Sequence, residues 1–125
     1  MKLLLELLEP RFAVCRLDAR ATVPAELLQG SQEFLSITRT AEELSIVCPE
    51  ALVPVGAKVQ PGWRAFKVMG PLDFSLTGII ATLTAPLAEA KISVFAVATY
   101  DTDYILVQEQ DLEGAKRALA PFLRG

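Results

Sequence analysis

The sequence predicts an α+β protein made of two similar halves, each with a strand, a helix and two further strands. Short apolar runs of strand length alternate with segments whose apolar residues recur at helical spacing. The 125 residues are 52% apolar, which is enough to fill a compact core but leaves each half too small to cover a sheet alone. We therefore expect an N-terminal half over residues 1–60 and a C-terminal half over residues 61–125.

In the first half, Glu9 and Pro10 predict a turn between two strands, and a polar turn over residues 39–42 predicts a hairpin. A short helix over residues 24–29 has a Pro in its first turn and Gly30 after its end. Pro and Gly are frequent in residues 49–62, which we expect to be a linker. The expected strands are residues 2–8, 12–17, 34–38 and 43–48.

In the second half, a strand over residues 63–69 precedes the strongest helical pattern, which Asp73 or Ser75 could cap. Pro86 lacks an N–H and is expected to kink or divide that helix. Its apolar face is predicted to contain Leu76, Ile79, Ile80, Leu83, Leu87 and Ala90. A hairpin of strands 92–98 and 103–108 follows, and a closing helix starts at Asp111, with Leu112, Ala115, Leu119 and Phe122 on one side.

The two halves match as an internal repeat. Residues 43–47 (ELSIV) align with residues 103–107 (DYILV), and the strand at 12–17 aligns with the one at 63–68. The offsets differ because the second helix is longer. Chance similarity between amphipathic strands is the alternative, since few residues are identical.

Composition excludes several protein classes. A net charge of −3 without a basic stripe argues against nucleic-acid binding, and no apolar run approaches the length of a membrane span. The N-terminus could be a signal peptide, but Glu6 and Glu9 interrupt its apolar stretch, so a leading strand in a cytoplasmic protein is expected.

Catalytic and metal-binding patterns are missing from the sequence. It contains no histidine and no glycine-rich phosphate loop. Pairs of acidic residues are present, but the loops of this short chain leave little space for the cleft that an acid/base pair needs for catalysis. Cys15 and Cys48 lie in apolar runs at a spacing unlike a redox or zinc motif, so both are expected to be buried free thiols. We expect no enzymatic activity, no metal and no cofactor.

Two segments carry chemistry suited to a ligand. Residues 70–78 lead from a strand into the main helix, where free N–H groups near Asp73 and Ser75 could meet a carboxylate. Residues 99–103 (TYDTD) combine two carboxylates, two hydroxyls and an aromatic ring, which could hold an ammonium or guanidinium group. An ordinary capped turn and a solvated hairpin tip are the alternatives.

Three blocks of the sequence resemble a family of short bacterial tandem ACT-domain proteins related to the CASTOR arginine sensors. They are residues 36–50 (SITRTAEELSIVCPE), 62–79 (GWRAFKVMGPLDFSLTGI) and 98–108 (ATYDTDYILVQ). The resemblance implies two ACT-like halves of ferredoxin-like, βαββαβ type, with an antiparallel sheet and helices on one face. Lys91 and Ala98 depart from the family pattern, where Gly and Ser are expected.

The resemblance also implies a ligand-binding site and a function. Transferred to this sequence, the site consists of Gly70, Leu72, Asp73, Phe74, Ser75, Thr99, Tyr100, Thr102 and Asp103. The expected function is a non-catalytic regulatory protein that binds a small molecule, typically an amino acid, with a homodimer or a regulated protein as partner. The alternative is an interaction module that dimerises or docks on a partner without binding a ligand.

Overall fold

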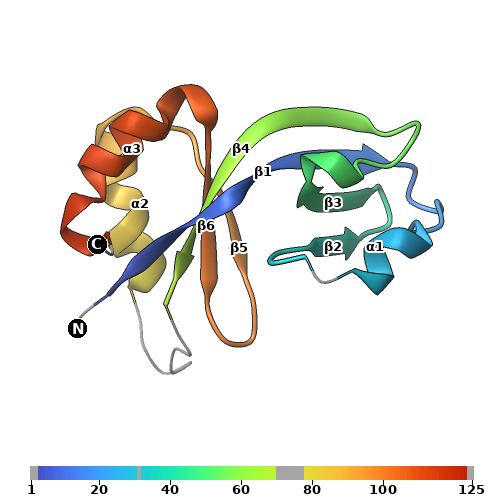
Figure 1. Cartoon of the computed structure of the whole chain (residues 1–125), viewed down its shortest axis with the longest axis horizontal. Helices are drawn as coiled ribbons and strands as arrows, with labels where there is room; N and C mark the ends of the chain where they lie inside the picture. Colours follow the sequence, from blue (N-terminus) through green and yellow to red (C-terminus); the bar gives the residue numbers. More distant parts are fainter. Residues whose placement is uncertain (1–2, 31, 70–77, 124–125) are drawn as a thin grey trace. The chain divides into compact units, whose positions relative to one another are not determined.

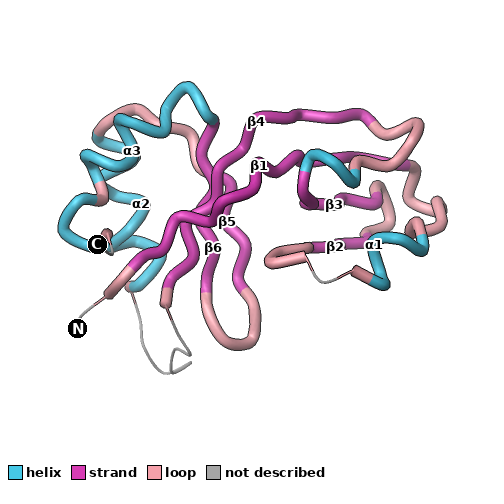
Figure 2. The backbone as a smooth tube through the Cα atoms, viewed as in Figure 1, coloured by secondary structure: helices cyan, strands magenta, loops and turns pink. Residues whose placement is uncertain are grey.

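The computed structural model describes residues 3–30, 32–69 and 78–123. Six strands hydrogen-bond in the order β2-β3-β1-β4-β6-β5, and the β1–β3, β2–β3 and β5–β6 ladders are antiparallel (Figures 1 and 2). This confirms the predicted α+β class. The elements are β1 (Leu5–Leu17), α1 (Ala25–Gln29), β2 (Ser36–Arg39), β3 (Leu44–Pro49), η1 (Glu50–Leu52), β4 (Lys58–Val68), α2 (Ile79–Glu89), β5 (Phe95–Ala98), β6 (Asp103–Gln108), η2 (Glu109–Asp111), α3 (Leu112–Ala118) and η3 (Ala120–Phe122).

The chain divides into two compact units. Unit 1 contains Met1–Leu8 and Arg64–Gly125, and unit 2 contains Glu9–Trp63, so β1 and β4 each contribute residues to both. The order strand, helix, strand, strand occurs twice, as β1-α1-β2-β3 and as β4-α2-β5-β6. None of the helices in the described ranges is long and apolar enough to cross a membrane.

In unit 1, α2 and α3 lie side by side and pack against the strands (Figure 1). On the predicted apolar face of α2, Ile79, Leu83 and Leu87 are buried, Ile80 and Ala90 are exposed, and Leu76 lies outside the described residues. At α3, the buried residues are Leu112 and Ala115 on the helix and Leu119 directly after its end. They meet Leu5, Phe66, Val68, Ile105 and Val107 of the strands in one apolar core.

The first and last described residues of the chain meet in unit 1. Leu5 forms an isolated parallel bridge with Leu123, and the N–H of Met69 donates to the carbonyl of Leu4 at 2.8 Å. Leu3 and Leu5 are both buried in the unit 1 core. The N-terminal segment is therefore part of the same hydrophobic core as α2 and α3.

Pro86 does not divide α2, so of the two expected effects, a kink or a division, the division is wrong. The N–H of Thr82 donates to Gly78 and the N–H of Ala90 donates to Pro86, so helical bonds continue on both sides of the proline. Leu83 and Leu87, one turn apart, are both fully buried. Packing of both turns on one core compensates for the single donor that proline lacks.

The end of α2 shows how the chain tolerates a residue other than the glycine expected at position 91. Lys91 adopts a positive φ of 61°. The N–H of Lys91 donates to Ala88 and that of Ile92 donates to Leu87, which satisfies carbonyls at the helix end. These bonds hold Lys91 in a conformation that glycine adopts at lower cost.

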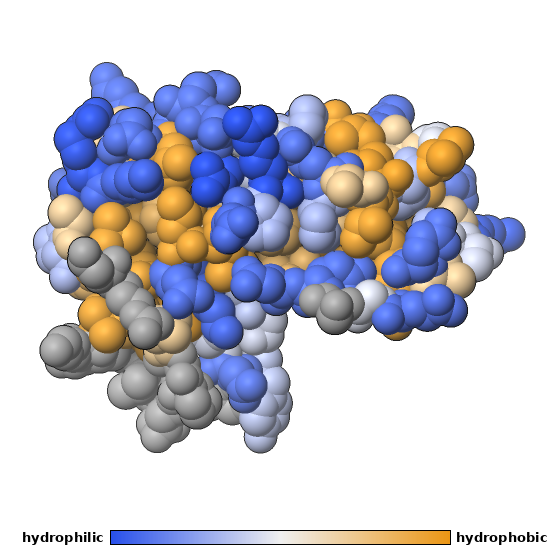
Figure 3. All heavy atoms as spheres, viewed as in Figure 1, coloured by the Kyte–Doolittle hydropathy of each residue, from blue (hydrophilic) through white to orange (hydrophobic). Residues whose placement is uncertain are grey.

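In unit 2, β3 lies between β1 and β2. β1 pairs with β3 from Phe12↔Pro49 to Leu17↔Leu44, and β2 pairs with β3 from Ser36↔Val47 to Arg39↔Leu44. The hairpin predicted around residues 39–42 is confirmed. Figure 3 shows apolar side chains at the surface over η1 and the turn that follows, where Val55 is fully exposed. The unit 2 core consists of Ala13, Cys15, Leu27, Leu44, Ile46 and Cys48.

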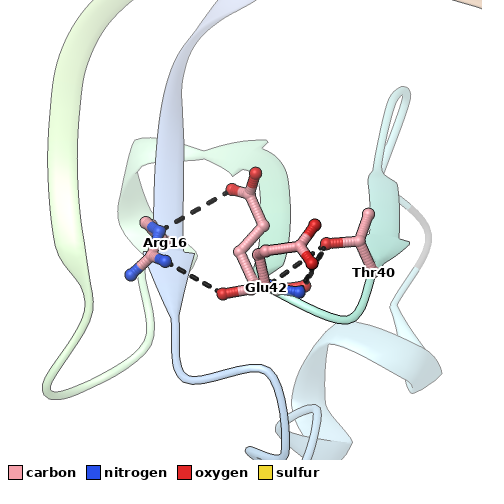
Figure 4. A network of polar contacts seen from close by, with 4 residues as sticks. Arg16, Thr40 and Glu42 are labelled. Atoms are coloured by element: carbon pink, nitrogen blue, oxygen red, sulfur yellow. Dashed lines mark hydrogen bonds and ion pairs between the residues drawn. The ribbon is translucent and has the colours of Figure 1, made fainter.

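The β2–β3 turn is closed by polar contacts (Figure 4). The hydroxyl of Thr40 accepts hydrogen bonds from the N–H groups of Glu42 and Glu43 at 3.1 and 3.2 Å. Arg16 on β1 donates to the carbonyl of Glu42 at 2.9 Å and lies 3.9 Å from the carboxylate of Glu43. All these groups are near the surface, so the ion pair adds little stability and mainly fixes the turn.

The turn predicted at Glu9 and Pro10 is wrong, because β1 runs without interruption from Leu5 to Leu17. Proline removes one strand donor, which normally excludes it from the middle of a sheet. On the β3 side, however, the ladder begins only at Phe12. Pro10 therefore lies outside that ladder, where its missing N–H costs no hydrogen bond to β3.

The predicted linker over residues 49–62 is only partly a loop. η1 follows β3 directly, and β4 already begins at Lys58. Gly62 lies inside β4 with a φ of +81°, and its N–H donates to the carboxylate of Glu50 at 2.7 Å. Glycine and proline in this segment therefore belong to an irregular strand. At its irregular position the N–H of Gly62 bonds to the side chain of Glu50.

Candidate functional site

The candidate site is built on the hairpin that joins β5 and β6 in unit 1. Ala98 pairs with Asp103 at its base, and the N–H of Thr99 donates to the carbonyl of Thr102 at 2.8 Å. The Thr99 hydroxyl also donates to that carbonyl at 3.0 Å and accepts from the N–H of Thr102 at 3.2 Å. The predicted hairpin is confirmed, with Tyr100 at its tip 81% exposed.

Thr102 ties this hairpin to the end of β4. Its side chain is buried, and its hydroxyl donates to the carbonyl of Val68 at 2.6 Å. Val68 is the last residue of β4, which directly precedes the second predicted segment in the chain. A buried hydroxyl that is satisfied in this way fixes the position of the hairpin base against β4.

Of the two segments predicted to bind a ligand, the structure describes residues 99–103 but not the site residues of 70–78. Thr99, Tyr100, Thr102 and Asp103 lie together on the hairpin described above. Gly70, Leu72, Asp73, Phe74 and Ser75 lie outside the described residues. The capping role predicted for Asp73 or Ser75 lies there as well.

Asp103 is the residue of the hairpin with the most distinctive electrostatics. It is half-buried as the first residue of β6, and burial raises the pKa of its carboxyl group. Across the described part of the chain, no hydrogen bond or ion pair satisfies this carboxylate. A carboxylate that loses water without gaining a partner is stabilised when a cation comes within contact distance.

The Arg64 side chain of unit 1 has structural partners. The guanidinium of Arg64 forms a 3.2 Å ion pair with Glu109 and donates to the carbonyl of Leu8 at 3.5 Å. No group of three or more His, Cys, Asp or Glu side chains that could hold a metal ion is present in residues 3–30, 32–69 and 78–123. Sequence reasoning missed the contact between the Thr102 hydroxyl and the carbonyl of Val68, since a backbone acceptor leaves no mark on residue type.

Comparison with family models divides the chain in a similar way. A model of the ACT domain matches residues 58–121, and a second model, described as an N-terminal domain, matches residues 10–56. The first match covers unit 1 from β4 to the end of α3 and includes the whole β5–β6 hairpin.

Curated relatives are longer than this chain. The cytosolic arginine sensor for mTORC1 subunit 1 of Bos taurus is 33% identical in an alignment 99 residues long, which covers 70% of this chain and 30% of the relative. The human putative protein CASTOR3P is 36% identical in an alignment 93 residues long, which covers 64% of this chain and 57% of the relative. The chain thus spans less than a third of the arginine sensor that it matches.

Solved structures share the fold. Protein Atu0741 from Agrobacterium tumefaciens has a TM-score of 0.86 and 37% identity, covering 100% of this chain and 96% of that one. The regulatory subunit of aspartate kinase from Thermus thermophilus has a TM-score of 0.63 and 15% identity, covering 89% of this chain and 91% of that one. At such low identity, the second likeness concerns the fold alone.

Proposed function

The chain belongs to the ACT domain family, and from that premise we propose that it is a non-catalytic regulatory protein that binds an amino acid. Several relatives are named arginine sensors, and others of the same fold are regulatory subunits of a kinase. We place the protein in the cytoplasm, because the sensor relatives are named cytosolic. A protein that it regulates is the proposed partner.

The observation that carries this proposal is the Asp103 carboxylate. It is half-buried, its pKa is raised by burial, and the described residues leave it without a counter-charge. An ammonium or guanidinium group would supply that charge through hydrogen bonds stronger than those between neutral groups. Arginine is therefore the first ligand to test, since it carries both cationic groups.

The other residues of the proposed site supply hydrogen-bonding groups and an aromatic ring for the ligand. Thr99 and Thr102 supply hydroxyl and backbone groups, and Tyr100 supplies an aromatic ring at the hairpin tip. We assign the α-carboxylate of the ligand to backbone N–H groups near Asp73, because helix starts have unpaired donors. The residues proposed on that side are Gly70, Leu72, Asp73, Phe74 and Ser75.

A thermal-shift panel of the twenty amino acids, followed by calorimetric titration, tests the proposal. A ligand at about 100 times its Kd should add roughly 2.7 kcal/mol to the free energy of unfolding. Asp103→Asn should weaken binding by about 10- to 100-fold, since it removes a charge-assisted hydrogen bond. Asp101→Asn is the matched control, because Asp101 is an exposed carboxylate on the same hairpin and should bind like the wild type.

The pH dependence of binding provides a second readout of the same residue. A cation binds the ionised carboxylate, so affinity should fall as the pH drops through the raised pKa of Asp103. The Asp103→Asn variant should lack this change. Equal affinity of the Asp103→Asn and Asp101→Asn variants would refute the site, and no stabilisation across the whole panel would favour an interaction module instead.

A further inference from the structure

Unit 2 contains a pair of thiols that the proposed amino-acid site does not use. Cys15 on β1 and Cys48 on β3 are both free and buried. Cys48 lies directly opposite Ala13, and Cys15 is two residues further along β1, so both side chains point to the same face of the sheet. The two thiols are hydrogen-bonded to each other. Both sulfur atoms are therefore within reach of one small ion.

The surroundings of this pair determine which kind of ion it suits. The residues that form one buried cluster with the two cysteines are all apolar, namely Ala13, Leu27, Leu44 and Ile46. In the part of the chain that the structure describes, no third His, Cys, Asp or Glu completes a larger ligand group with them. Mg²⁺ and Ca²⁺, which need oxygen ligands, and Zn²⁺, which takes four ligands, are therefore poorly matched. Two thiolates suit a soft cation that is satisfied by two ligands, and Cu(I) is such a cation.

The spacing of the two cysteines also favours an ion over a disulfide. Diagonal neighbours in an antiparallel ladder have Cα atoms about 7–8 Å apart, whereas a disulfide usually needs about 4.4–6.8 Å. An S–S bond is about 2 Å long, but two metal–thiolate bonds of about 2.3 Å in line place the sulfur atoms about 4.6 Å apart. The longer bridge spans the diagonal without a shift of β1 relative to β3.

The short helix α1 provides a route to the buried thiols. Leu27 is the only buried residue of its five, and Pro24 at its start supplies no capping side chain. A short helix held by one buried side chain opens locally at a small cost in free energy. Because Leu27 belongs to the same cluster as the thiols, opening of α1 admits solvent and an ion to them.

We propose that Cys15 and Cys48 bind one Cu(I) ion in a linear, two-coordinate site. Two S–H bonds are replaced by two Cu–S bonds, both protons pass to solvent, and the copper keeps its oxidation state. The bound cation stabilises the thiolate form, whereas without it both thiols keep their protons and remain apolar. The sequence alone does not predict this site, because the two cysteines meet only when β1 pairs with β3.

Anaerobic titration of the full chain with Cu(I) held by a chromogenic chelator tests the proposal. One ion per chain should pass from the chelator to the protein, and the bound ion should raise the melting temperature. Cys15→Ala and Cys48→Ala are matched variants, since each keeps one thiol. Loss of an outer-shell partner costs up to about 100-fold in metal affinity, so loss of one of only two ligands should cost at least about 100-fold. Zn²⁺ is the control ion and should not stabilise the wild type.

X-ray absorption of the copper-loaded wild type provides a readout that needs no variant. The spectrum should show two sulfur neighbours at about 2.2–2.3 Å and no oxygen or nitrogen neighbours. Circular dichroism verifies that the alanine variants fold.

Three results would overturn the proposal. They are failure of the wild type to take Cu(I) from the chelator, equal affinity in the wild type and a folded single-cysteine variant, and oxygen or nitrogen neighbours in the absorption spectrum. The thiols belong to unit 2 and the β5–β6 hairpin to unit 1, so the outcome does not depend on whether the Asp103 site binds an amino acid.

Discussion

The two cysteines show how environment sets the chemistry of a side chain. Cys15 and Cys48 are free, buried in the unit 2 core and hydrogen-bonded to each other. Burial raises the pKa of both thiols, and together with the neighbouring Cys15 it raises the pKa of Cys48 to about 12. Since the thiolate is the reactive form, these residues act as small apolar side chains at neutral pH, as predicted from the sequence.

This pKa shift predicts a loss of stability at alkaline pH. The Cys48 thiol ionises near 9.0 in the unfolded chain and near 12 in the folded one, so only the unfolded state loses the proton between these values. The free energy of unfolding should therefore fall as the pH rises from 9 toward 12. Urea titrations at a series of pH values measure this slope.

Other groups also titrate in this range, so the control removes the thiols. The Cys15→Ala, Cys48→Ala double variant should show a shallower decrease in stability over the same pH range. An identical decrease in the wild type and the double variant would show that the buried thiols do not cause it.

The sequence identified Asp103 as a candidate site residue, but it did not predict the burial of its carboxylate. The TYDTD pattern predicts a polar hairpin, and the hairpin is present with the expected strands on both sides. Burial of one carboxylate and exposure of its neighbour Asp101 follow from the fold, because the two residues have the same side chain and lie two positions apart. Only their position relative to β6 distinguishes them.

At the scale of elements, the hairpin depends on one buried hydroxyl. Thr102→Val keeps the side-chain volume but removes the donor to the Val68 carbonyl, which would remain buried without a partner. The free energy of unfolding should fall by about 1–3 kcal/mol, the cost of leaving a buried polar group unsatisfied. Thr38→Val on β2 is the matched control, because Thr38 is exposed and its replacement should change little.

Urea denaturation of both variants provides the comparison. Equal stability of Thr102→Val and wild type would mean that the hydroxyl does not hold the hairpin to β4. A loss of amino-acid binding in Thr102→Val without a loss of stability would point to a direct contact with the ligand.

Helix and strand periodicity predicted most elements, whereas the breaks predicted at two prolines are not present. Apolar spacing identified α2 and α3 because one face of each packs on the same core. Pro10 and Pro86 signal breaks by local rules alone. The structure shows that the β3 ladder begins only after Pro10 and that burial of Leu87 holds α2 together beyond Pro86, and neither fact is local in sequence.

At the scale of the whole molecule, the two units share strands. β1 and β4 each contribute residues to both, so no single loop separates one unit from the other along the chain. We therefore expect one cooperative unfolding transition. Trp63, the only tryptophan in the sequence, reports on unit 2, whereas the ellipticity at about 222 nm comes mainly from α2 and α3 of unit 1.

Guanidinium titrations followed by both signals test this expectation. Coincident midpoints and slopes for tryptophan fluorescence and ellipticity are the predicted outcome. Two separated transitions would mean that each unit unfolds independently despite the shared strands.

The meeting of Leu5 with Leu123 has a consequence for how the protein is made. Residues 3–8 are translated before unit 2, yet their apolar partners on α2 and α3 are translated after it. Unit 2, a single stretch from Glu9 to Trp63, is complete while the remaining codons are still being read. Leu3 and Leu5 therefore lack their core partners until α2 and α3 have been translated.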